Sequence, residues 1–223
     1  MIRLNFALRR LPGLSRAEFQ DYWREKHGPL VTGVSRALRM HRYVQTHTVE
    51  DPLVDALRAA HPGMEEPFDG IASVWFDSRD ELIVATTSAE GRKAGALLLD
   101  DERRFIDLTR SPLWVSQEIA QIHPTTENSI VALPKSPWIK ICCLLNPKPG
   151  IQSQTLDDEL NDQLRATRGG PPPYAGLSET WLDRDDLAKG FAAFLEDEKH
   201  FIDFTYSSVW AAKELVFVGE GAC

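Results

Sequence analysis

Residues 101–114, DERRFIDLTRSPLW, recur as residues 197–210, DEKHFIDFTYSSVW, and eight of the fourteen positions are identical. Further upstream, residues 75–77 (WFD) recur as residues 181–183 (WLD). Such self-similarity is typical of a duplicated structural unit whose copies bury their apolar faces against each other. The repeat therefore predicts a fold built from two related halves.

One stretch of the first half has no copy. Residues 19–30, FQDYWREKHGPL, occur once, in a predicted helix that begins after Ser15, where Glu18 completes a capping box. From the first strand to the strand tryptophan there are about 75 residues in the first half but about 43 in the second. Roughly 30 residues, as much as one helix and one strand, are thus absent from the second half. We predict that the second half is a truncated copy and that the unpaired segment carries the chemistry.

The pattern of the first half predicts the order β-α-β-β-α-β, which is the split βαβ plan of ferredoxin-like domains. The predicted class is α+β with antiparallel sheets, in two repeats that form an intramolecular pseudo-dimer. The first predicted domain spans residues 1–122, a polar, proline-bearing linker spans 123–137, and the truncated repeat spans 138–223. The predicted strands of the first domain are residues 2–8, 39–49, 68–76 and 113–122.

The composition disfavours several classes of protein. A net charge of −8 leaves no basic surplus to neutralise phosphates, so neither nucleic acid nor an anionic membrane is a predicted partner. No apolar run approaches the roughly 20 residues needed to span a bilayer, and the N-terminus lacks the apolar core of a signal peptide. Three cysteines without framework spacing fit reduced thiols. These features predict a cytoplasmic location.

Several motifs, taken in order, resemble the EthD family, which is named for a protein needed in alkyl ether degradation. They are F-x-x-Y-W-x-x-x-H-G-P-L at residues 19–30, Y-V-Q-x-H at 43–47, D-G-x-x-x-x-W-F-D-S at 69–78 and F-I-D at 105–107. The resemblance covers residues 1–122 well and 174–218 in part. It implies membership of the dimeric α/β-barrel superfamily, in which two ferredoxin-like units pair sheet to sheet.

The resemblance restricts the expected fold more than the expected function. Characterised relatives in the superfamily include cofactor-free muconolactone isomerases, polyketide cyclases and decarboxylases, quinone-forming monooxygenases and haem enzymes, because one fold hosts many chemistries. The leading hypothesis is a cofactor-independent lyase or isomerase that acts on a small apolar oxygenated metabolite. The alternatives are an oxidoreductase of ether or aromatic degradation, cofactor-free or haem-linked, and a non-catalytic ligand-binding accessory protein.

His27 is the leading catalytic candidate. An imidazole titrates near neutral pH, so it can take and return a proton, and the resemblance implies this role because the matching histidine of related isomerases is an acid/base group. The other interpretation is a structural histidine that holds the turn at residues 28–29. Tyr22 is a second catalytic candidate because its hydroxyl could reach a ligand, while Trp23 is predicted either to line the site or to pack in the core.

Three polar-tipped side chains project from one face of a predicted strand. Tyr43, Gln45 and His47 alternate with their neighbours, so they share a face that is expected to meet the core. Buried polar groups need partners, which a bound ligand would supply. We predict that these residues bind substrate; the alternative is that they form hydrogen bonds at the interface between the two units.

Ser73 departs from the family pattern, since relatives usually carry glutamate two residues before the strand tryptophan. The first half has Ser73 before Trp75, whereas the second half has Glu179 at the matching place. The first half thus has His27 without the carboxylate, and the second has the carboxylate without a histidine. One interpretation is a composite site in which Glu179 is catalytic and Ser73 and Trp75 bind substrate; the other is that the pattern has decayed.

No metal site is predicted, because no helix carries a His-x-x-x-His or Glu-x-x-His pair. No cofactor is predicted either; haem, with His27 as axial ligand, is the alternative. The predicted partner is a small hydrophobic molecule. A complete pseudo-dimer would make association of two chains unnecessary, but the truncation leaves an exposed sheet face or edge with which a homodimer could form.

Overall fold

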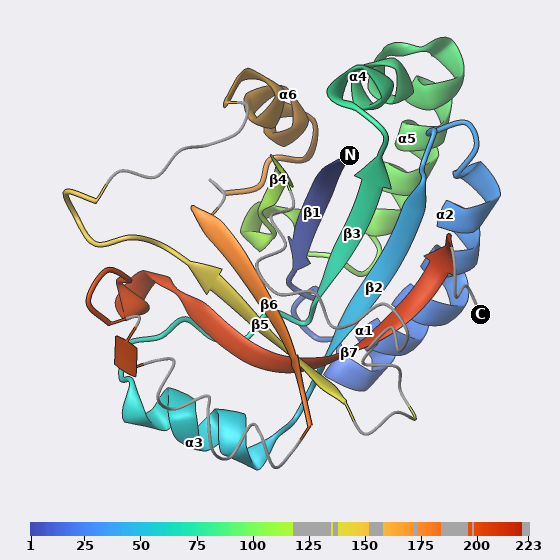
Figure 1. The fold of residues 1–223 in the computed structure, drawn as a ribbon. Coiled ribbons are helices and arrows are strands. Elements are labelled where there is room, and N and C mark those ends of the chain that lie inside the picture. The colour runs from blue at the N-terminus through green and yellow to red at the C-terminus, as the bar shows by residue number, and fades with distance from the viewer. Residues whose placement is uncertain are drawn as a thin grey trace.

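Seven antiparallel strands form one continuous sheet in the computed structural model (Figure 1). The structure describes residues 1–117, 135, 138–151, 158–171, 174–183, 196–197 and 199–219. The strand order is β4-β1-β3-β2-β7-β5-β6. The strands are β1 (Ile2–Leu8), β2 (Arg42–Val49), β3 (Gly70–Phe76), β4 (Leu113–Ser116), β5 (Ile139–Leu145), β6 (Gly176–Leu182) and β7 (Ser208–Val218). The predicted α+β class and antiparallel sheet are confirmed.

Short helices connect these strands. The capping box predicted at the first helix is present, because the Ser15 side chain accepts from the Glu18 backbone N–H and Glu18 reaches back to Ser15. The helices are α1 (Arg16–Tyr22), η1 (Trp23–His27), α2 (Gly28–Val34), α3 (Pro52–Ala60), α4 (Arg79–Thr87), α5 (Ala89–Glu102), η2 (Leu108–Arg110), α6 (Asp158–Arg168) and η3 (Phe204–Tyr206). None of the helices in the described ranges is long and apolar enough to cross a membrane.

The two halves of the sheet differ by one strand and one helical segment. The first half contributes β4-β1-β3-β2, and the second contributes only β7-β5-β6. Between β1 and α3 lie 43 residues (9–51), which form α1, η1, α2 and β2, but only 12 residues (146–157) separate β5 from α6. The second half therefore has no room for counterparts of α1 and β2. Most of the predicted linker, residues 123–137, lies outside the described residues.

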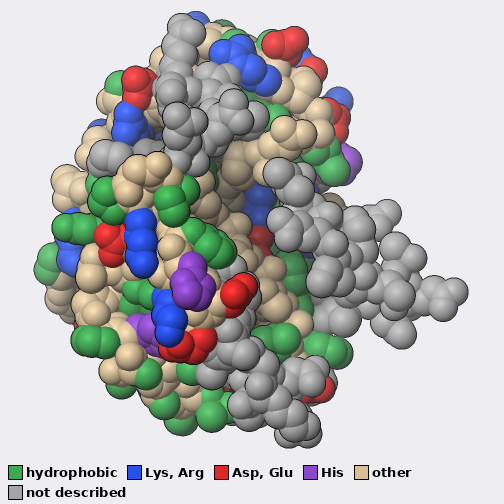
Figure 2. Space-filling model, turned by 60° about the vertical axis from the view of Figure 1, so that its left-hand side comes forward, with side chains coloured by type: hydrophobic (Ala, Val, Ile, Leu, Met, Phe, Trp, Pro, Cys, Tyr) green, Lys and Arg blue, Asp and Glu red, His purple; other side chains and the backbone are tan. Residues whose placement is uncertain are grey.

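The sheet curls until strands from its two ends meet. Arg3 on β1 forms an ion pair with Glu179 on β6, although four strands lie between β1 and β6 in the sheet order. With strands about 4.8 Å apart, a flat sheet would hold these residues more than 20 Å from each other. The sheet therefore wraps into an open barrel with an inner and an outer face. Figure 2, which brings the left-hand side of Figure 1 forward, shows a hollow in the surface with basic and acidic side chains deep inside it.

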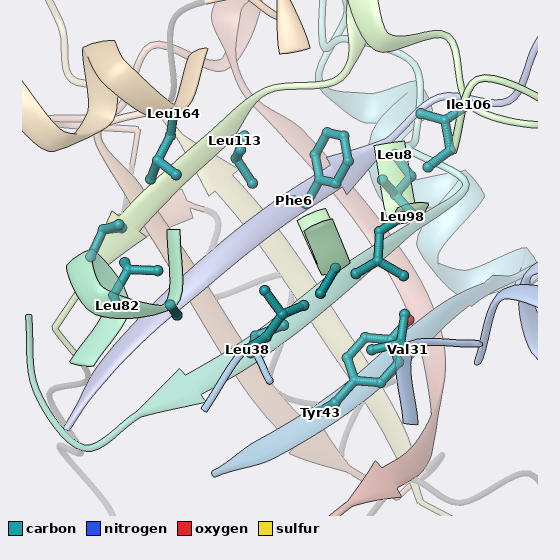
Figure 3. Close-up of a cluster of buried hydrophobic side chains, with 14 of the residues drawn as sticks. Phe6, Leu8, Val31, Leu38, Tyr43, Leu82, Leu98, Ile106, Leu113 and Leu164 are labelled. Atoms are coloured by element: carbon teal, nitrogen blue, oxygen red, sulfur yellow. The ribbon is translucent and has the colours of Figure 1, made fainter. Parts of the chain in front are cut away.

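The outer face of the first half is covered by its helices. Phe6, Leu8 and Tyr43 point from β1 and β2 into a large apolar cluster that includes Phe19 of α1 and Leu98 of α5 (Figure 3). The inner face carries a separate apolar cluster, drawn from both halves, that contains Ala7, Ile71, Trp114, Cys142, Leu144 and Trp210. Alternate residues of each strand thus serve two distinct environments.

The connecting helix of each half covers the outer face of the other half. Val54 of α3 packs against Val209 and Ala211 of β7, in a cluster of buried residues shared with β5. Leu164 of α6 packs in the outer cluster of the first half with Leu113 of β4. The two connecting helices, α3 and α6, therefore occupy equivalent positions in the pseudo-dimer.

Candidate functional site

The unpaired segment of the sequence forms a π-helix that ends at His27. In η1 the backbone N–H of Gly28 donates to the carbonyl of Trp23, five residues earlier. The cause lies in Pro29, which has no N–H and whose ring would clash with the carbonyl four residues before it in a regular α-helix. Gly28 allows a close approach: a Cβ there would overlap the ring of Phe217 on β7. Single π-helical turns occur frequently at functional sites.

His27 is held by a carboxylate from α5. Its Nδ1 lies 2.8 Å from Oδ2 of Asp101, and the hydroxyl of Tyr22 donates to Oδ1 of the same carboxylate at 2.7 Å. The His27 ring packs against Phe105, with the ring centroids 5.2 Å apart. Burial, followed by the hydrogen bond to Asp101, raises the pKa of Tyr22, so this phenol keeps its proton. The three side chains form one hydrogen-bonded unit, which we call the His27 triad.

The triad leaves one ring nitrogen of His27 available. In neutral imidazole the nitrogen that faces a carboxylate carries the proton, so Nδ1–H donates to Asp101 and Nε2 presents its lone pair. Nε2 makes no hydrogen bond to any residue in the described ranges, and 7% of the side chain is exposed. An imidazole oriented in this way can accept a proton at Nε2 while the carboxylate stabilises the resulting cation.

Tyr43, Gln45 and His47 do share a face, but their polar groups satisfy one another. The amide nitrogen of Gln45 donates to the Tyr43 hydroxyl at 3.0 Å and to the Trp23 carbonyl at 2.9 Å. Its amide oxygen lies 2.8 Å from Nε2 of His47, whose ring stacks on Trp23 with centroids 4.4 Å apart. Trp23 Nε1 donates to the Tyr43 hydroxyl at 3.2 Å. The network joins η1 to the sheet beneath it.

Burial fixes the protonation states in this network. Burial lowers the pKa of His47 to about 3, with a smaller effect from the positive charge of Arg24. His47 is therefore a neutral hydrogen-bonding side chain at physiological pH. Burial also raises the pKa of Tyr43, which stays protonated. Neither group titrates near neutrality, so this network holds no group that exchanges a proton at pH 7.

Ser73 and Glu179 meet on the inner face, and both bind Arg3. One guanidinium nitrogen of Arg3 donates to the Ser73 hydroxyl at 2.8 Å and to Glu179 Oε1 at 2.8 Å. The guanidinium also lies over the ring of Trp75, 4.7 Å from its centroid. Position 73 has no carboxylate, and Glu179 of the second half brings one to this place. This carboxylate binds Arg3 and not His27.

Lys140, also on the inner face, extends this group of charges. Its amino nitrogen lies 2.6 Å from Glu179 and 2.8 Å from Glu214, and Trp181 Nε1 donates to Glu214 at 2.9 Å. Burial opposes the charge on Lys140, but the two carboxylates outweigh it and raise its pKa. Burial likewise opposes the charge on Glu179, and Arg3 and Lys140 together lower the pKa of this carboxyl well below its usual range. We call Arg3, Lys140, Glu179 and Glu214 the inner ionic layer.

The structure therefore separates the predicted site residues into two groups. Tyr22, Trp23, His27, Tyr43, Gln45 and His47 lie on the outer face, beneath or within the helices. Ser73, Trp75 and Glu179 lie on the inner face. His27 and Glu179, which a composite site would join, are thus on opposite sides of the sheet.

Sequence reasoning did not single out Asp101 as a partner of His27, nor Arg3 and Lys140 as partners of Glu179. Asp101 belongs to the duplicated stretch, which the repeat suggested was purely structural. A signal was present for Arg3: in β1 it alternates with the apolar residues Ile2 and Leu4, so it points to the opposite, inner face.

The surroundings of His27 do not fit a haem. The ring is packed against Phe105, only 7% of the side chain is exposed, and Phe217 lies against the adjacent Gly28. A planar macrocycle needs an open face beside its axial ligand, which this packing leaves no room for. Across the described ranges, no group of three or more His, Cys, Asp or Glu side chains is arranged to hold a metal ion.

Comparison with known proteins agrees with the resemblance. The family profile described as EthD domain matches residues 11–109. Among solved structures, the chain is similar to one described as an ethyl tert-butyl ether (EthD) family protein from Bacillus halodurans, with 19% identity, a TM-score of 0.37, and coverage of 53% of this chain and 100% of that one. No curated protein matches the chain significantly. The matched residues 11–109 contain the whole His27 triad.

Proposed function

We propose that the protein, whose residues 11–109 match the EthD family profile, is a cofactor-independent lyase or isomerase that acts on a small, apolar, oxygenated metabolite by proton transfer through His27. The observation that carries the proposal is the 2.8 Å contact between His27 Nδ1 and Asp101, which leaves Nε2 to receive a proton. A histidine needed only for packing would not require an oriented carboxylate behind it.

The proposed reaction needs only the proton and the substrate. Nε2 of His27 removes a proton from a carbon next to the substrate carbonyl, and the electron pair of that C–H bond forms an enolate. Return of the proton to a different atom gives an isomer, whereas its transfer to a departing hydroxyl group gives an alkene and water. Asp101 stabilises the imidazolium that exists between the two transfers. Tyr22 is a positioning residue that holds Asp101 by its second oxygen.

Deuterium exchange tests this function and does not require that the substrate be identified first. The protein is incubated with a mixed metabolite extract in D2O, and mass spectrometry identifies compounds that gain one deuterium, because His27 exchanges the abstracted proton with solvent. The wild-type protein should label at least one compound. His27→Gln should slow this labelling by about 10²- to 10⁴-fold, the usual contribution of a general base. Asp101→Asn should slow it less, and Tyr22→Phe less again.

A matched control exists in the same half of the chain. His41 also faces a carboxylate, with Nδ1 3.5 Å from Asp77, but its side chain is 57% exposed. His41→Gln should leave the labelling unchanged. The proposal is wrong if His27→Gln, folded as judged by circular dichroism, labels the same compounds at the wild-type rate.

The second candidate function is that of a non-catalytic, ligand-binding accessory protein. It is favoured by the packing of the outer face, where Phe19, Trp23 and Phe105 are fully buried and the polar side chains of β2 satisfy one another. This function predicts that some compound in the extract raises the melting temperature, since a ligand stabilises the state it binds. It also predicts that no compound gains deuterium and that His27→Gln leaves the thermal shift unchanged.

A further inference from the structure

Three buried polar side chains on the inner face have atoms without hydrogen-bond partners. Within the described ranges, Asn5 Oδ1, Thr46 Oγ1 and Trp210 Nε1 are buried and unpaired. All three residues are at most 1% exposed. Buried polar groups are almost always paired, so several unpaired atoms on one face need an explanation. Turning the Asn5 amide over does not remove the deficit, because Ser116, its one side-chain partner among the described residues, would then engage the oxygen and leave the nitrogen unpaired.

Asn5 and Thr46 lie near each other on the sheet, and Trp210 belongs to the apolar cluster beside them. Asn5 is paired in register with Ser73 of β3, and Thr46 is paired with Ile71, two residues away on the same face. Trp210 packs in the inner cluster that contains Ile71 and its partner Ala7. The three residues therefore border the inner apolar cluster, and Thr46 is paired in register with Glu214 of the inner ionic layer.

The neighbouring charged side chains do not supply partners for the three unpaired atoms. Arg3 and Lys140 are paired with Glu179 and Glu214, and the further cation nearby, Arg42, lies over the ring of Trp75, 5.0 Å from its centroid. The unpaired groups themselves comprise an acceptor at Asn5, a donor at Trp210, and a hydroxyl at Thr46 that serves as either. A complementary molecule is uncharged and carries at least one donor and one acceptor.

Among the described residues, no strand lies between β6 and β4. A strand equivalent to β2 would close the barrel at this place. Every residue of β6 is at least partly exposed, unlike those of the inner strands. The hollow with charged side chains in its depth is consistent with this opening (Figure 2).

We propose that the inner face, at Asn5, Thr46 and Trp210, is a second binding site, distinct from the His27 triad, for a small uncharged molecule that carries a hydroxyl group together with a second hydroxyl, a carbonyl or an amide. The molecule enters beside β6, donates to Asn5 and accepts from Trp210. This site does not depend on the proposed proton-transfer function, because it lies on the opposite face of the sheet.

Two threonines on the same strand face give a matched test. Thr46 has no partner for its hydroxyl, whereas the hydroxyl of Thr48 donates to the Phe68 carbonyl at 2.6 Å. Without ligand, Thr46→Val removes an unpaired buried group and should raise the melting temperature by about 2–4 °C, whereas Thr48→Val should lower it. Propane-1,2-diol, used as the probe, should raise the melting temperature of the wild type and of Thr48→Val but not that of Thr46→Val.

The indole N–H of Trp210 reports binding directly. In a ¹H–¹⁵N spectrum it is one of six tryptophan indole signals and is assigned with Trp210→Phe. Titration with propane-1,2-diol should move this signal saturably, with a dissociation constant on the order of millimolar for so small a molecule. Cyclopentane, an apolar molecule of the same size, should not move it. Thr46→Val should weaken the effect at least tenfold, and His27→Gln should leave it unchanged.

Three outcomes would overturn the proposal. The first is an indole signal that stays unmoved at diol concentrations far above millimolar, which would mean that water alone satisfies the three atoms. The second is an equal response in Thr46→Val, which would place the diol elsewhere. The third is a loss of the response in His27→Gln, which would mean that the two sites are one.

Discussion

The two copies of the repeated sequence form the same turn, but the phenylalanine of that turn is buried in the first copy and partly exposed in the second. In the first copy, Phe105 is fully buried, with its ring centroid 5.4 Å from that of Phe19 and 5.0 Å from that of Tyr22. In the second copy, Phe201 occupies the equivalent position and is 41% exposed. The backbone is alike in both, since an isolated bridge joins Arg10 to Ile106 and another joins Pro147 to Ile202. The difference lies in the helix above the turn.

This comparison separates what the duplicated residues do from what the unpaired segment adds. The duplicated residues build a turn that docks on the first strand of each half. The α1–η1 segment covers that turn in the first half only, and it brings Tyr22 and His27 to Asp101. Asp197, the copy of Asp101, is exposed. One aspartate thus binds a histidine and a tyrosine and the other is exposed, although their local sequences agree.

The largest expected effect tests whether the α1–η1 segment buries the turn of the first copy. Phe105→Ala removes a fully buried ring and should lower the free energy of unfolding by about 3–5 kcal/mol, whereas Phe201→Ala should lower it by less than about 1 kcal/mol because that ring already contacts water. Denaturant-induced unfolding of both variants measures the difference. Equal losses would show that the second copy is covered in solution, and the comparison would fail.

The inner ionic layer joins the second half to the first. Breaking it should give the next largest loss in the free energy of unfolding. Glu179→Gln leaves Arg3 and Lys140 with less compensation for their buried charges and should cost about 3 kcal/mol. The matched control is Glu81→Gln, which breaks the exposed pair with Arg39 and should cost no more than about 0.5 kcal/mol.

Glu179→Gln should also change how the stability of the protein depends on pH. Because the pKa of Glu179 is lowered in the folded state from an ordinary value of 4.5, its stabilisation is fully present above pH 4.5 and declines as the pH falls below that value. The wild type should therefore lose stability between about pH 4.5 and pH 3 more steeply than Glu179→Gln. Parallel curves would mean that the carboxylate is not ionised in the layer.

Much of this architecture follows from sequence patterns, and the parts that do not are long-range. The capping box at Ser15 and Glu18 acts within one turn of helix, so local spacing suffices to predict it. Alternation likewise predicts that Tyr43, Gln45 and His47 share a face. It does not reveal that they satisfy one another, because that depends on Trp23 of another element.

The pairing of Arg3 with Glu179 was beyond such reasoning for a related reason. Each residue's face follows from its own strand, but their contact depends on the curl of six strands and on the strand that the second half lacks. His27 on η1 and Asp101 on α5 are 74 positions apart in the sequence, and no periodicity relates the two positions. The sequence thus predicts the elements and their faces, while packing decides which faces meet.

His47, which stacks on Trp23 of η1, should have a smaller, pH-dependent effect on stability. Its pKa is about 3 in the folded state against 6.5 ordinarily, so the unfolded chain binds a proton that the folded chain does not. Stability is then fully present above pH 6.5 and falls by up to about 1.4 kcal/mol per pH unit as the pH decreases toward 3.

His47→Gln tests this linkage, because glutamine retains a donor for Gln45 and does not titrate. Between about pH 6 and pH 4.5, the free energy of unfolding of the variant should depend less steeply on pH than that of the wild type, by nearly one proton. Identical slopes would indicate that His47 reaches water, and that α1 and η1 do not seal the first half as the comparison requires.

The smallest expected difference lies in the turn that both copies share. Ser111 donates to the Asp107 carbonyl at 2.7 Å and accepts from the Arg9 N–H, and Ser207 donates to the Asp203 carbonyl at 2.8 Å and accepts from the Asn146 N–H. Both serines are fully buried. Ser111→Ala and Ser207→Ala should therefore each lower the free energy of unfolding by about 1–3 kcal/mol and differ by less than about 0.5 kcal/mol. Nearly equal losses here, beside a large difference between Phe105→Ala and Phe201→Ala, would mean that the repeat forms the turn and that the unpaired segment buries it in the first half. A much smaller loss for Ser207→Ala than for Ser111→Ala would mean that the second copy has the sequence of the turn but does not depend on it for stability.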